Sequence, residues 1–253
     1  MKHLWIPDTQ IREGVPVRHI DALANYIVDK RPDKIIIAGD WWDFPSVSHW
    51  NTKREQETQR LQDDIGAGNR ALHALLGPIQ ELTEKTVRQK RKAYRPEIHF
   101  LMGNHEDRLQ RFIDANPVLE GLLGFHLLSL HKYDIQVHPF KQILNLDGIR
   151  YCHFFYRAGS GSPYTGMIET KIKNIGFSFT QGHMQEFAYG ERQLPDGQVH
   201  HGLVAGAFYL HDETYKGPQA NAHWRGVVMK HEVRNGEYDI SKISARFLLS
   251  RYL

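Results

Sequence analysis

The chain has 253 residues, of which 41% are apolar and 11% aromatic, and its formal net charge is +3 at pH 7. This apolar content argues against intrinsic disorder, and no run approaches the roughly 18 apolar residues of a membrane-spanning helix. The single cysteine, Cys152, excludes an internal disulfide and thiolate-rich zinc sites, so a reducing cytoplasm is the expected location. The length fits one domain with an elaboration or two small domains.

The first 38 residues carry the pattern of a strand–helix–strand unit. We expect a short strand at His3–Pro7 and an amphipathic helix at Val17–Lys30, where apolar residues recur at helical spacing. Pro32 breaks the helix, and the continuous apolar run within Lys34–Ala38 is typical of a buried parallel strand. The pattern therefore predicts an α/β fold that opens with a βαβ unit.

A charged helical segment follows, and we interpret residues 53–92 as a helical insertion. Its apolar stripe is interrupted by glycines and by Gly77-Pro78, so we expect a bent or broken helical hairpin rather than one rod. We expect the stripe to pack on the domain of a monomer. The alternative is that it forms the contact between the two subunits of a homodimer. Six of the eleven residues in Lys85–Arg95 are basic and none is acidic, which fits a solvated helix end or a phosphate-binding patch equally well.

The remaining chain changes from α/β to β-rich texture. A strand is expected at Glu97–Met102 and a helix at Glu106–Ala115. Beyond Tyr133, short β runs alternate with turn signals, and Tyr164–Asn174 is the one expected helix. With neither an internal repeat nor a low-complexity linker, residues 1–253 are predicted to form one domain.

Acidic, amide and imidazole groups end the apolar runs at four places, which are Pro7–Gln10, Gly39–Asp43, Gly103–Glu106 and Gly182–Gln185. The first three follow predicted strands, and residues beyond the carboxyl ends of strands converge on the ligand-binding edge of an α/β sheet. His153, after a further strand, adds an imidazole. Together these groups form a ligand set for divalent metals.

The order of these motifs resembles that of the calcineurin-like metallophosphoesterases, which carry Asp-x-His, Gly-Asp-x-x-Asp, Gly-Asn-His-Asp/Glu, a single His and Gly-His-x-His. The resemblance covers roughly Lys2 to Gln185, and its two middle motifs are the most specific. It implies a four-layer β-sandwich, in which two mixed sheets are flanked by helices. The chain also resembles phage and prophage phosphoesterases of unassigned substrate, which implies a viral origin with action in the host cytoplasm.

Carried over position by position, the resemblance implies two neighbouring metal ions bridged by Asp40. Asn104, His153 and His183 would complete one site, and Asp8, Gln10 and Gln185 would complete the other. The family usually has His at the positions of Gln10 and Gln185, so both departures fall on one site, which becomes all oxygen. We therefore expect one tight site and one weaker, oxygen-rich site, with Mn²⁺ favoured and Mg²⁺ as the alternative.

The resemblance also implies hydrolysis of phosphate esters by in-line attack of a metal-bound water. His105 would act on the leaving oxygen as general acid or charge stabiliser, and Asp43 would fix its tautomer. Arg108 could reach a phosphate, and of the adjacent tryptophans we expect one to be buried and one, Trp42, to line the cleft.

Several functions remain open at this point. The basic run, the tryptophans and the insertion favour a phosphodiester of nucleic acid or a nucleotide as the substrate. A phosphomonoesterase or protein phosphatase is the alternative within the same chemistry. A non-catalytic homologue that binds metal and phosphate is the alternative from another class. No membrane partner is expected, and Tyr209–Trp224, rich in His and aromatic residues, has no assignment.

Overall fold

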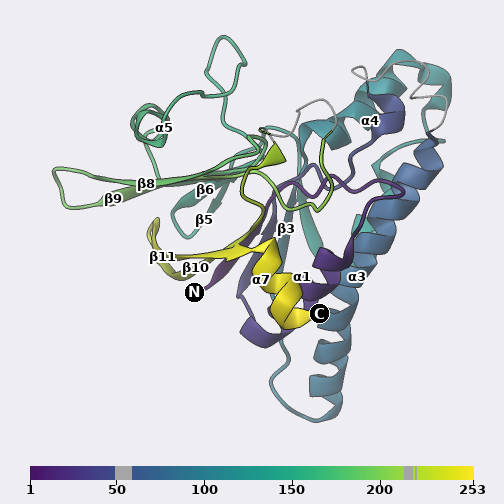
Figure 1. Cartoon of the computed structure of the whole chain (residues 1–253), viewed down its shortest axis with the longest axis horizontal. Helices are drawn as coiled ribbons and strands as arrows, with labels where there is room; N and C mark the ends of the chain where they lie inside the picture. The colour runs from purple at the N-terminus through teal and green to yellow at the C-terminus, as the bar shows by residue number, and fades with distance from the viewer. Residues whose placement is uncertain (49–58, 214–218, 220) are drawn as a thin grey trace.

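The computed structural model describes residues 1–48, 59–213, 219 and 221–253 (Figure 1). Residues 53–58 of the predicted insertion lie outside the described residues, as does part of the unassigned stretch 209–224. Two mixed β-sheets and five α-helices make up the described fold, which is therefore α/β as predicted.

The first sheet has six strands in the order β11-β10-β1-β2-β3-β4. Strands β1 to β4 are parallel, whereas β10 and β11 continue the sheet in antiparallel fashion. The bounds are β1 His3–Ile6, β2 Lys34–Ile37, β3 Glu97–Leu101, β4 Ile135–His138, β10 Gly226–Arg234 and β11 Glu237–Ser244.

The second sheet has five strands in the order β5-β6-β7-β9-β8. Its central strands β6, β7 and β9 are parallel, and the edge strands β5 and β8 are antiparallel to their neighbours. The bounds are β5 Leu144–Leu146, β6 Ile149–Cys152, β7 Phe179–Gln181, β8 Phe187–Gln193 and β9 Val199–Ala205.

Helices cover the outer face of each sheet, so the layers run helix, sheet, sheet, helix (Figure 1). The helices are α1 Arg18–Lys30, α3 Leu61–Arg88, α4 Asn104–Ala115, α5 Ile168–Ile175 and α7 Ala245–Tyr252, with short 3₁₀ turns at Pro45–Val47, Pro117–Leu119, Phe125–Leu127 and Ser129–Lys132. Helices α1, α3 and α7 share one apolar core with the first sheet, and α5 packs on the second.

The continuous apolar run of β2 is explained by this layering. Ile35 and Ile37 point into the core under the helices, whereas Ile36 points into the core between the two sheets, and all three are fully buried. Successive side chains of a strand face opposite sides, so a strand covered on both faces needs apolar residues at every position. The prediction of a buried parallel strand is confirmed.

The expected helical hairpin is wrong over the residues that the structure describes. Leu61–Arg88 is one continuous helix that contains Pro78. Leu72 and Leu75 of its apolar stripe are fully buried in the core beside α1. Burial of a long apolar face stabilises a helix by more than one proline and a few glycines destabilise it.

The short helix of the second half begins later than expected, at Ile168 rather than near Tyr164. Tyr156 and Pro163 instead form an isolated β-bridge before it. Within the described residues, none of the helices combines the length and apolar character needed to cross a bilayer.

Candidate metal centre

The predicted ligand groups converge at one edge of the two sheets. Asp8, Asp40 and Asn104 follow the carboxyl ends of β1, β2 and β3. His153 and His183 follow the carboxyl ends of β6 and β7 in the other sheet. Because both sheets direct parallel strands to this edge, loops far apart in sequence meet there.

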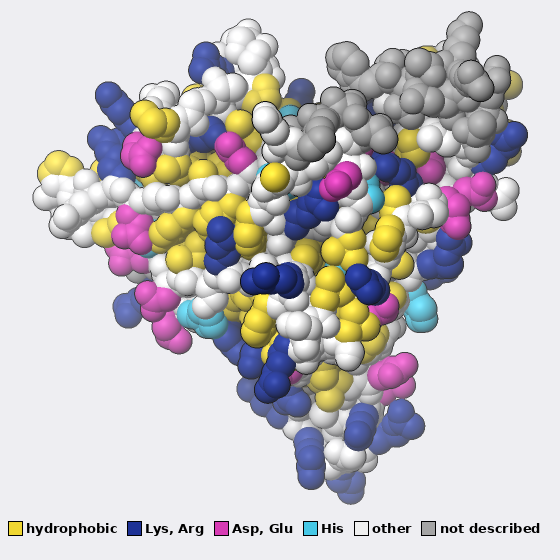
Figure 2. Space-filling view, in the orientation of Figure 1, with side chains coloured by type: hydrophobic (Ala, Val, Ile, Leu, Met, Phe, Trp, Pro, Cys, Tyr) yellow, Lys and Arg dark blue, Asp and Glu magenta, His cyan; other side chains and the backbone are white. Residues whose placement is uncertain are grey.

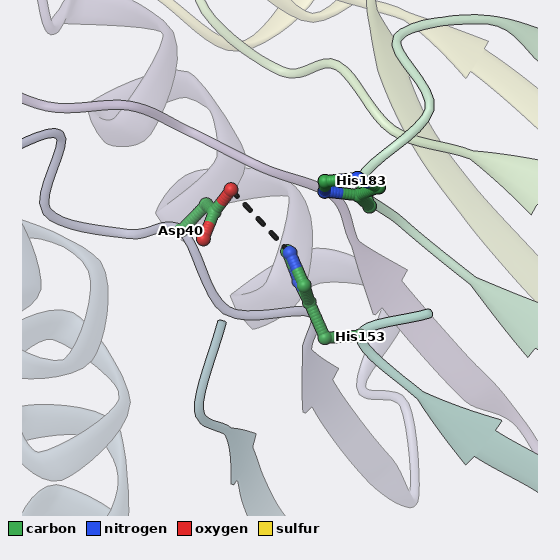
Figure 3. A group of neighbouring side chains, drawn as sticks. All are labelled: Asp40, His153 and His183. Atoms are coloured by element: carbon green, nitrogen blue, oxygen red, sulfur yellow. Dashed lines mark ion pairs between the residues drawn. The ribbon is translucent and has the colours of Figure 1, made fainter. Parts of the chain in front are cut away.

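Three of these side chains form a compact cluster (Figure 3). The ligand atoms of Asp40, His153 and His183 lie within 4.8 Å of one another, and Asp40 Oδ2 is 3.4 Å from His153 Nε2. Asp40 and His153 are buried, and His183 is partly buried. A buried carboxylate with two imidazoles fits a borderline divalent cation.

The backbone of the cluster is strained. Gln10, Asp40 and His183 have φ values of 45°, 47° and 62°, in the left-handed region that residues with a Cβ seldom adopt. The N–H groups of Thr9 and Gln10 both donate to the Asp40 carbonyl, which fixes the two loops together. Such strain persists only where the surroundings enforce it, and it concentrates at functional sites.

Two glycines let backbone approach the carboxylates closely. A Cβ at Gly103 would lie 2.2 Å from Asp40 Oδ1, and one at Gly182 would lie 2.4 Å from Asp8 Oδ1. Both distances are far below van der Waals contact, so any side chain at these positions would displace a proposed metal ligand.

His153 is oriented by its second ring nitrogen. Nδ1 lies 2.8 Å from the Ala38 carbonyl, which turns Nε2 toward Asn104 Oδ1 at 2.9 Å and toward Asp40. A carbonyl that fixes the tautomer of a ligating His is the usual support of a metal site. Burial lowers the pKa of His153, but the charges of Asp40 and Asp8 outweigh it and raise the pKa to about 10. Burial lowers the pKa of His183 to about 4.

The residues of the expected oxygen-rich site also fit a cation. Asp8 is fully buried, its carboxylate accepts a hydrogen bond from the N–H of His183 at 3.0 Å, and burial raises its pKa to about 7. Among the described residues, Gln10 Oε1 and Gln185 Oε1 are buried acceptors without a hydrogen-bond donor. Buried acceptors are normally paired, and amide oxygens are among the ligands of hard divalent cations, so the chemistry of these two atoms fits a cation.

His105 lies beside the cluster and is held by Asp43. Its Nδ1 is 3.0 Å from Asp43 Oδ1, and its Nε2 is 3.5 Å from Asp40 Oδ2. Burial lowers the pKa of His105, but the charges of Asp40 and Asp43 outweigh that effect, so the net shift is upward. Burial alone would raise the pKa of Asp43, yet its contacts with His105 and Arg12 lower it to about 2.

Two arginines flank the His105–Asp43 pair. Arg108 donates to the Asp43 carbonyl at 2.9 Å and lies 2.8 Å from His105 Nε2. Arg12, which was not predicted, pairs with the Asp43 carboxylate and lies 3.4 Å from Glu213. The position of Arg12, two residues after the proposed ligand Gln10, could have indicated a role near the site. Glu213 comes from the unassigned stretch 209–224, where no sequence pattern indicated such a role.

Trp42 does not line the cleft, so its prediction as a substrate-binding residue is wrong for this structure. Trp41 and Trp42 are both fully buried. Trp41 Nε1 donates to the Gly68 carbonyl of α3 at 3.0 Å, and the Trp42 ring lies 5.8 Å from that of Phe100. Helix α3 covers both indoles, and neither is available to stack on a base.

Glu106 has a larger role than a favourable charge at a helix end. It is fully buried, and its carboxylate accepts hydrogen bonds from the N–H groups of Asp40, Trp41, Trp42 and Gly103. The side chain therefore holds the loop that carries Asp40 against the start of α4.

Comparison with known proteins gives a distant relative. No family model matches the chain. The Gene 54 protein of Mycobacterium phage L5 is 28% identical over 134 residues, which are 51% of this chain and 46% of the phage protein. The match thus spans about half the length of each protein.

Proposed function

We propose that this chain is a metal-dependent hydrolase of phosphate esters of the calcineurin-like metallophosphoesterase type, with phosphodiesters of nucleic acid or nucleotides as the preferred substrates. The observation that carries the proposal is the position of His105, whose Nδ1 contacts Asp43 while its Nε2 faces Asp40 of the Asp–His–His cluster. A ligand cluster alone could be structural, but an oriented imidazole at its edge is what proton transfer to a leaving oxygen requires.

The residues divide into two proposed metal sites. Asp40, Asn104, His153 and His183 would hold one divalent ion, and Asp8, Gln10, Asp40 and Gln185 would hold the other. When bound, the ions supply Lewis acidity and lower the pKa of water from 15.7 toward about 7. The amide oxygens of the second set favour Mn²⁺ or Mg²⁺ over Zn²⁺ and a lower affinity.

The protein side chains would bind and orient the ester. Asp43 Oδ1, 3.0 Å from His105 Nδ1, would orient the ring so that Nε2 is the atom directed at the leaving oxygen. Arg108 lies beside Nε2, where its guanidinium can donate to a phosphate oxygen. Partial charges that develop on phosphorus oxygens would be stabilised by groups already in place.

Two further observations support the assignment. The described fold has the helix, sheet, sheet, helix order of the proposed family, with the ligands at the carboxyl ends of its parallel strands. The relative is a phage protein, which supports a viral origin and action in the host cytoplasm.

The test is hydrolysis of bis-p-nitrophenyl phosphate and p-nitrophenyl phosphate by metal-stripped protein with Mn²⁺, Mg²⁺ or Zn²⁺ added. We expect Mn²⁺-dependent cleavage that favours the diester. Asp40→Asn should lose both metal and activity, whereas His105→Ala should keep its metal and lose activity by about 10² or more. Exposed Asp114→Asn and His126→Ala are the matched controls and should behave like wild type.

Metal binding without hydrolysis of either ester or of DNA, RNA and cyclic nucleotides would overturn the proposal in favour of a non-catalytic homologue. Preference for the monoester would retain the hydrolase and reject the diester specificity. Loss of metal in His105→Ala would move that residue from the acid role into the ligand set.

A further inference from the structure

The basic run of the sequence lies on the edge of the molecule opposite to the metal centre. Lys85, Arg88, Lys90, Arg91, Lys92 and Arg95 occupy the end of α3 and the loop that leads into β3. We call these six residues, together with Arg31, the basic edge, and all seven are exposed. In Figure 2, Lys and Arg side chains gather at the narrow lower end, where α3 ends in Figure 1.

Strand direction separates the two regions. The loop of the basic edge enters the amino end of β3, whereas Gly103 and Asn104 leave its carboxyl end. Five residues of strand at about 3.3 Å each separate them by roughly 16 Å along the sheet. A phosphate bound at the proposed metal centre would therefore lie out of reach of the basic edge. Any ligand of the basic edge must be a different group.

The charge of the basic edge is largely uncompensated. Within the described part of the chain, Arg88 pairs with Glu84 at 3.6 Å, and the other six cations have no carboxylate within 4.0 Å. Of the neighbouring acids, Glu97 pairs with Lys34 and Asp33 accepts from the backbone N–H of Lys2, and exposed Glu81 has no cation within 4.0 Å among the described residues. Clustered exposed cations without counter-charges produce a positive potential that attracts polyanions.

The loop that presents these cations is fixed to the fold. Tyr94 Oη donates to the Pro32 carbonyl at 2.8 Å, and Thr83 Oγ1 donates to the Tyr94 carbonyl at 2.5 Å. The bond between Tyr94 and Pro32 joins residues that are 62 positions apart in the sequence. It brings Arg31, which precedes Pro32, next to the loop. An ordered array loses less conformational entropy on binding than a flexible tail does.

The composition of the surface favours nucleic acid over a membrane. Among the described residues of the segment 85–95, Val87 is the exposed large apolar side chain, and it is half exposed. Surfaces that bind bilayers combine cations with aromatic or apolar groups that enter the interface. Lysine and arginine without such groups suit the regular phosphates of a nucleic-acid backbone, which are bound without reading sequence.

We propose that the basic edge is a second, sequence-independent binding surface for the nucleic-acid backbone. It would retain a polymer on the protein while another segment reaches the metal centre. The binding does not depend on the proposed hydrolysis, although the use of the retained polymer as substrate does.

The test measures binding in EDTA, where hydrolysis cannot interfere. The probes are fluorescent 30-nucleotide single-stranded and duplex DNA of mixed sequence, titrated by anisotropy from 50 to 200 mM salt. The variant Arg91→Glu with Lys92→Glu is compared with Lys173→Glu with Arg192→Glu, which makes the same charge change at exposed positions on α5 and β8.

We expect wild type and the α5/β8 variant to bind alike, and the basic-edge variant to lose about tenfold or more at 50 mM salt. The slope of log K against log salt should become shallower by about 2, since two phosphate contacts are lost. Both variants should retain wild-type hydrolysis of the small diester. The milder Arg91→Gln with Lys92→Gln should lose affinity by a smaller factor.

An equal loss of DNA affinity in both double variants would overturn the proposal, because the affinity would then depend on the net charge of the protein and not on the basic edge. Absence of DNA binding by wild type, or binding to anionic vesicles in its place, would overturn it as well. Failure of the hydrolase proposal would instead appear as unchanged DNA binding in a protein without esterase activity.

Discussion

The carboxylate of Glu106 accepts two N–H groups on each oxygen, from Asp40 and Gly103 on one and from Trp41 and Trp42 on the other. Glu106→Gln replaces one acceptor oxygen by an NH₂ group, which leaves two buried N–H groups facing a donor. We expect the free energy of unfolding to fall by about 2–4 kcal/mol, and metal affinity to fall because the loop that carries Asp40 loses its anchor. Urea denaturation and a metal titration measure the two effects.

Asp107→Asn is the matched control for this substitution. Asp107 is the next residue in the same helical turn and makes a partly exposed i,i+4 pair with Arg111 at 3.0 Å. Its replacement should change the free energy of unfolding by less than about 1 kcal/mol. If Glu106→Gln proves as mild as the control, Glu106 contributes only its charge at the start of α4.

At the scale of single residues, the sequence predicts side chains that follow strand ends. Asp40 and His153 each follow a strand that the sequence predicts, which places them at strand ends, whereas His183 is joined to them through the family resemblance. Arg12 and Glu213 could not, since 201 positions separate them and no local pattern encodes their contact. The burial of Trp42 was equally hidden, because it depends on where α3 crosses the loop.

Helix α3 offers a test of how one element is fitted to the molecule. A Cβ at Gly68 would lie 1.9 Å from Trp42 Nε1, whereas a Cβ at Gly66 meets only the flexible end of Arg70 at 3.1 Å. Gly→Ala gains up to about 1 kcal/mol of helix propensity at either position. At Gly68 the overlap with a fully buried indole should cost about 1–3 kcal/mol and outweigh that gain.

We therefore expect Gly66→Ala to raise the melting temperature slightly and Gly68→Ala to lower it. Thermal unfolding of the two variants by circular dichroism, alongside wild type, is the measurement. A stabilised Gly68→Ala would mean that Trp42 does not pack against α3, and it would restore Trp42 as a candidate for the cleft.

Among the elements, β1, β2, β3, α1 and α4 were predictable from local pattern, the strands beyond Tyr133 only as short β runs, and α3 only in part. In β2 the continuous apolar sequence agrees with the burial of the strand, because its side chains lie alternately in two hydrophobic cores. In α3, Gly77-Pro78 signals a break that the buried stripe overrides. Local signals fail where long-range packing supplies most of the stabilisation of an element.

At the scale of the whole molecule, the α/β class follows from the sequence pattern and the two mixed sheets are implied by the family resemblance, but the strand order was not predictable. Strand β10, from the other end of the chain, pairs with β1, and β11 pairs with β10 at the edge of the sheet, which no spacing in the sequence encodes. Tyr151 of β6 lies 2.8 Å from His3 of β1, and this buried polar contact joins the two sheets.

Two buried histidines, His3 and His19, predict that the stability of the folded chain depends on pH. Burial lowers the pKa of His19 from 6.5 to about 3, and burial with the charge of Lys230 lowers that of His3 to about 4. Above pH 6.5 both rings are neutral whether the chain is folded or unfolded, so they add no pH dependence. Below pH 6.5 these histidines bind protons in the unfolded chain but stay neutral in the folded chain. The free energy of unfolding therefore falls as the pH falls toward the folded-state pKa values of about 4 and about 3.

For His19 the loss between pH 6.5 and 5 should be roughly 2 kcal/mol, from about 1.4 kcal/mol per pH unit. His19→Leu removes the titrating ring from its edge-on contact with Phe208 and should flatten the urea-derived stability curve by that amount between pH 7 and 5. His73→Asn, at an exposed position of α3, is the matched substitution. If His19→Leu keeps the wild-type slope, the ring is accessible to protons in the folded state, and the packing of α1 against the loop at Phe208 is looser than the structure has it.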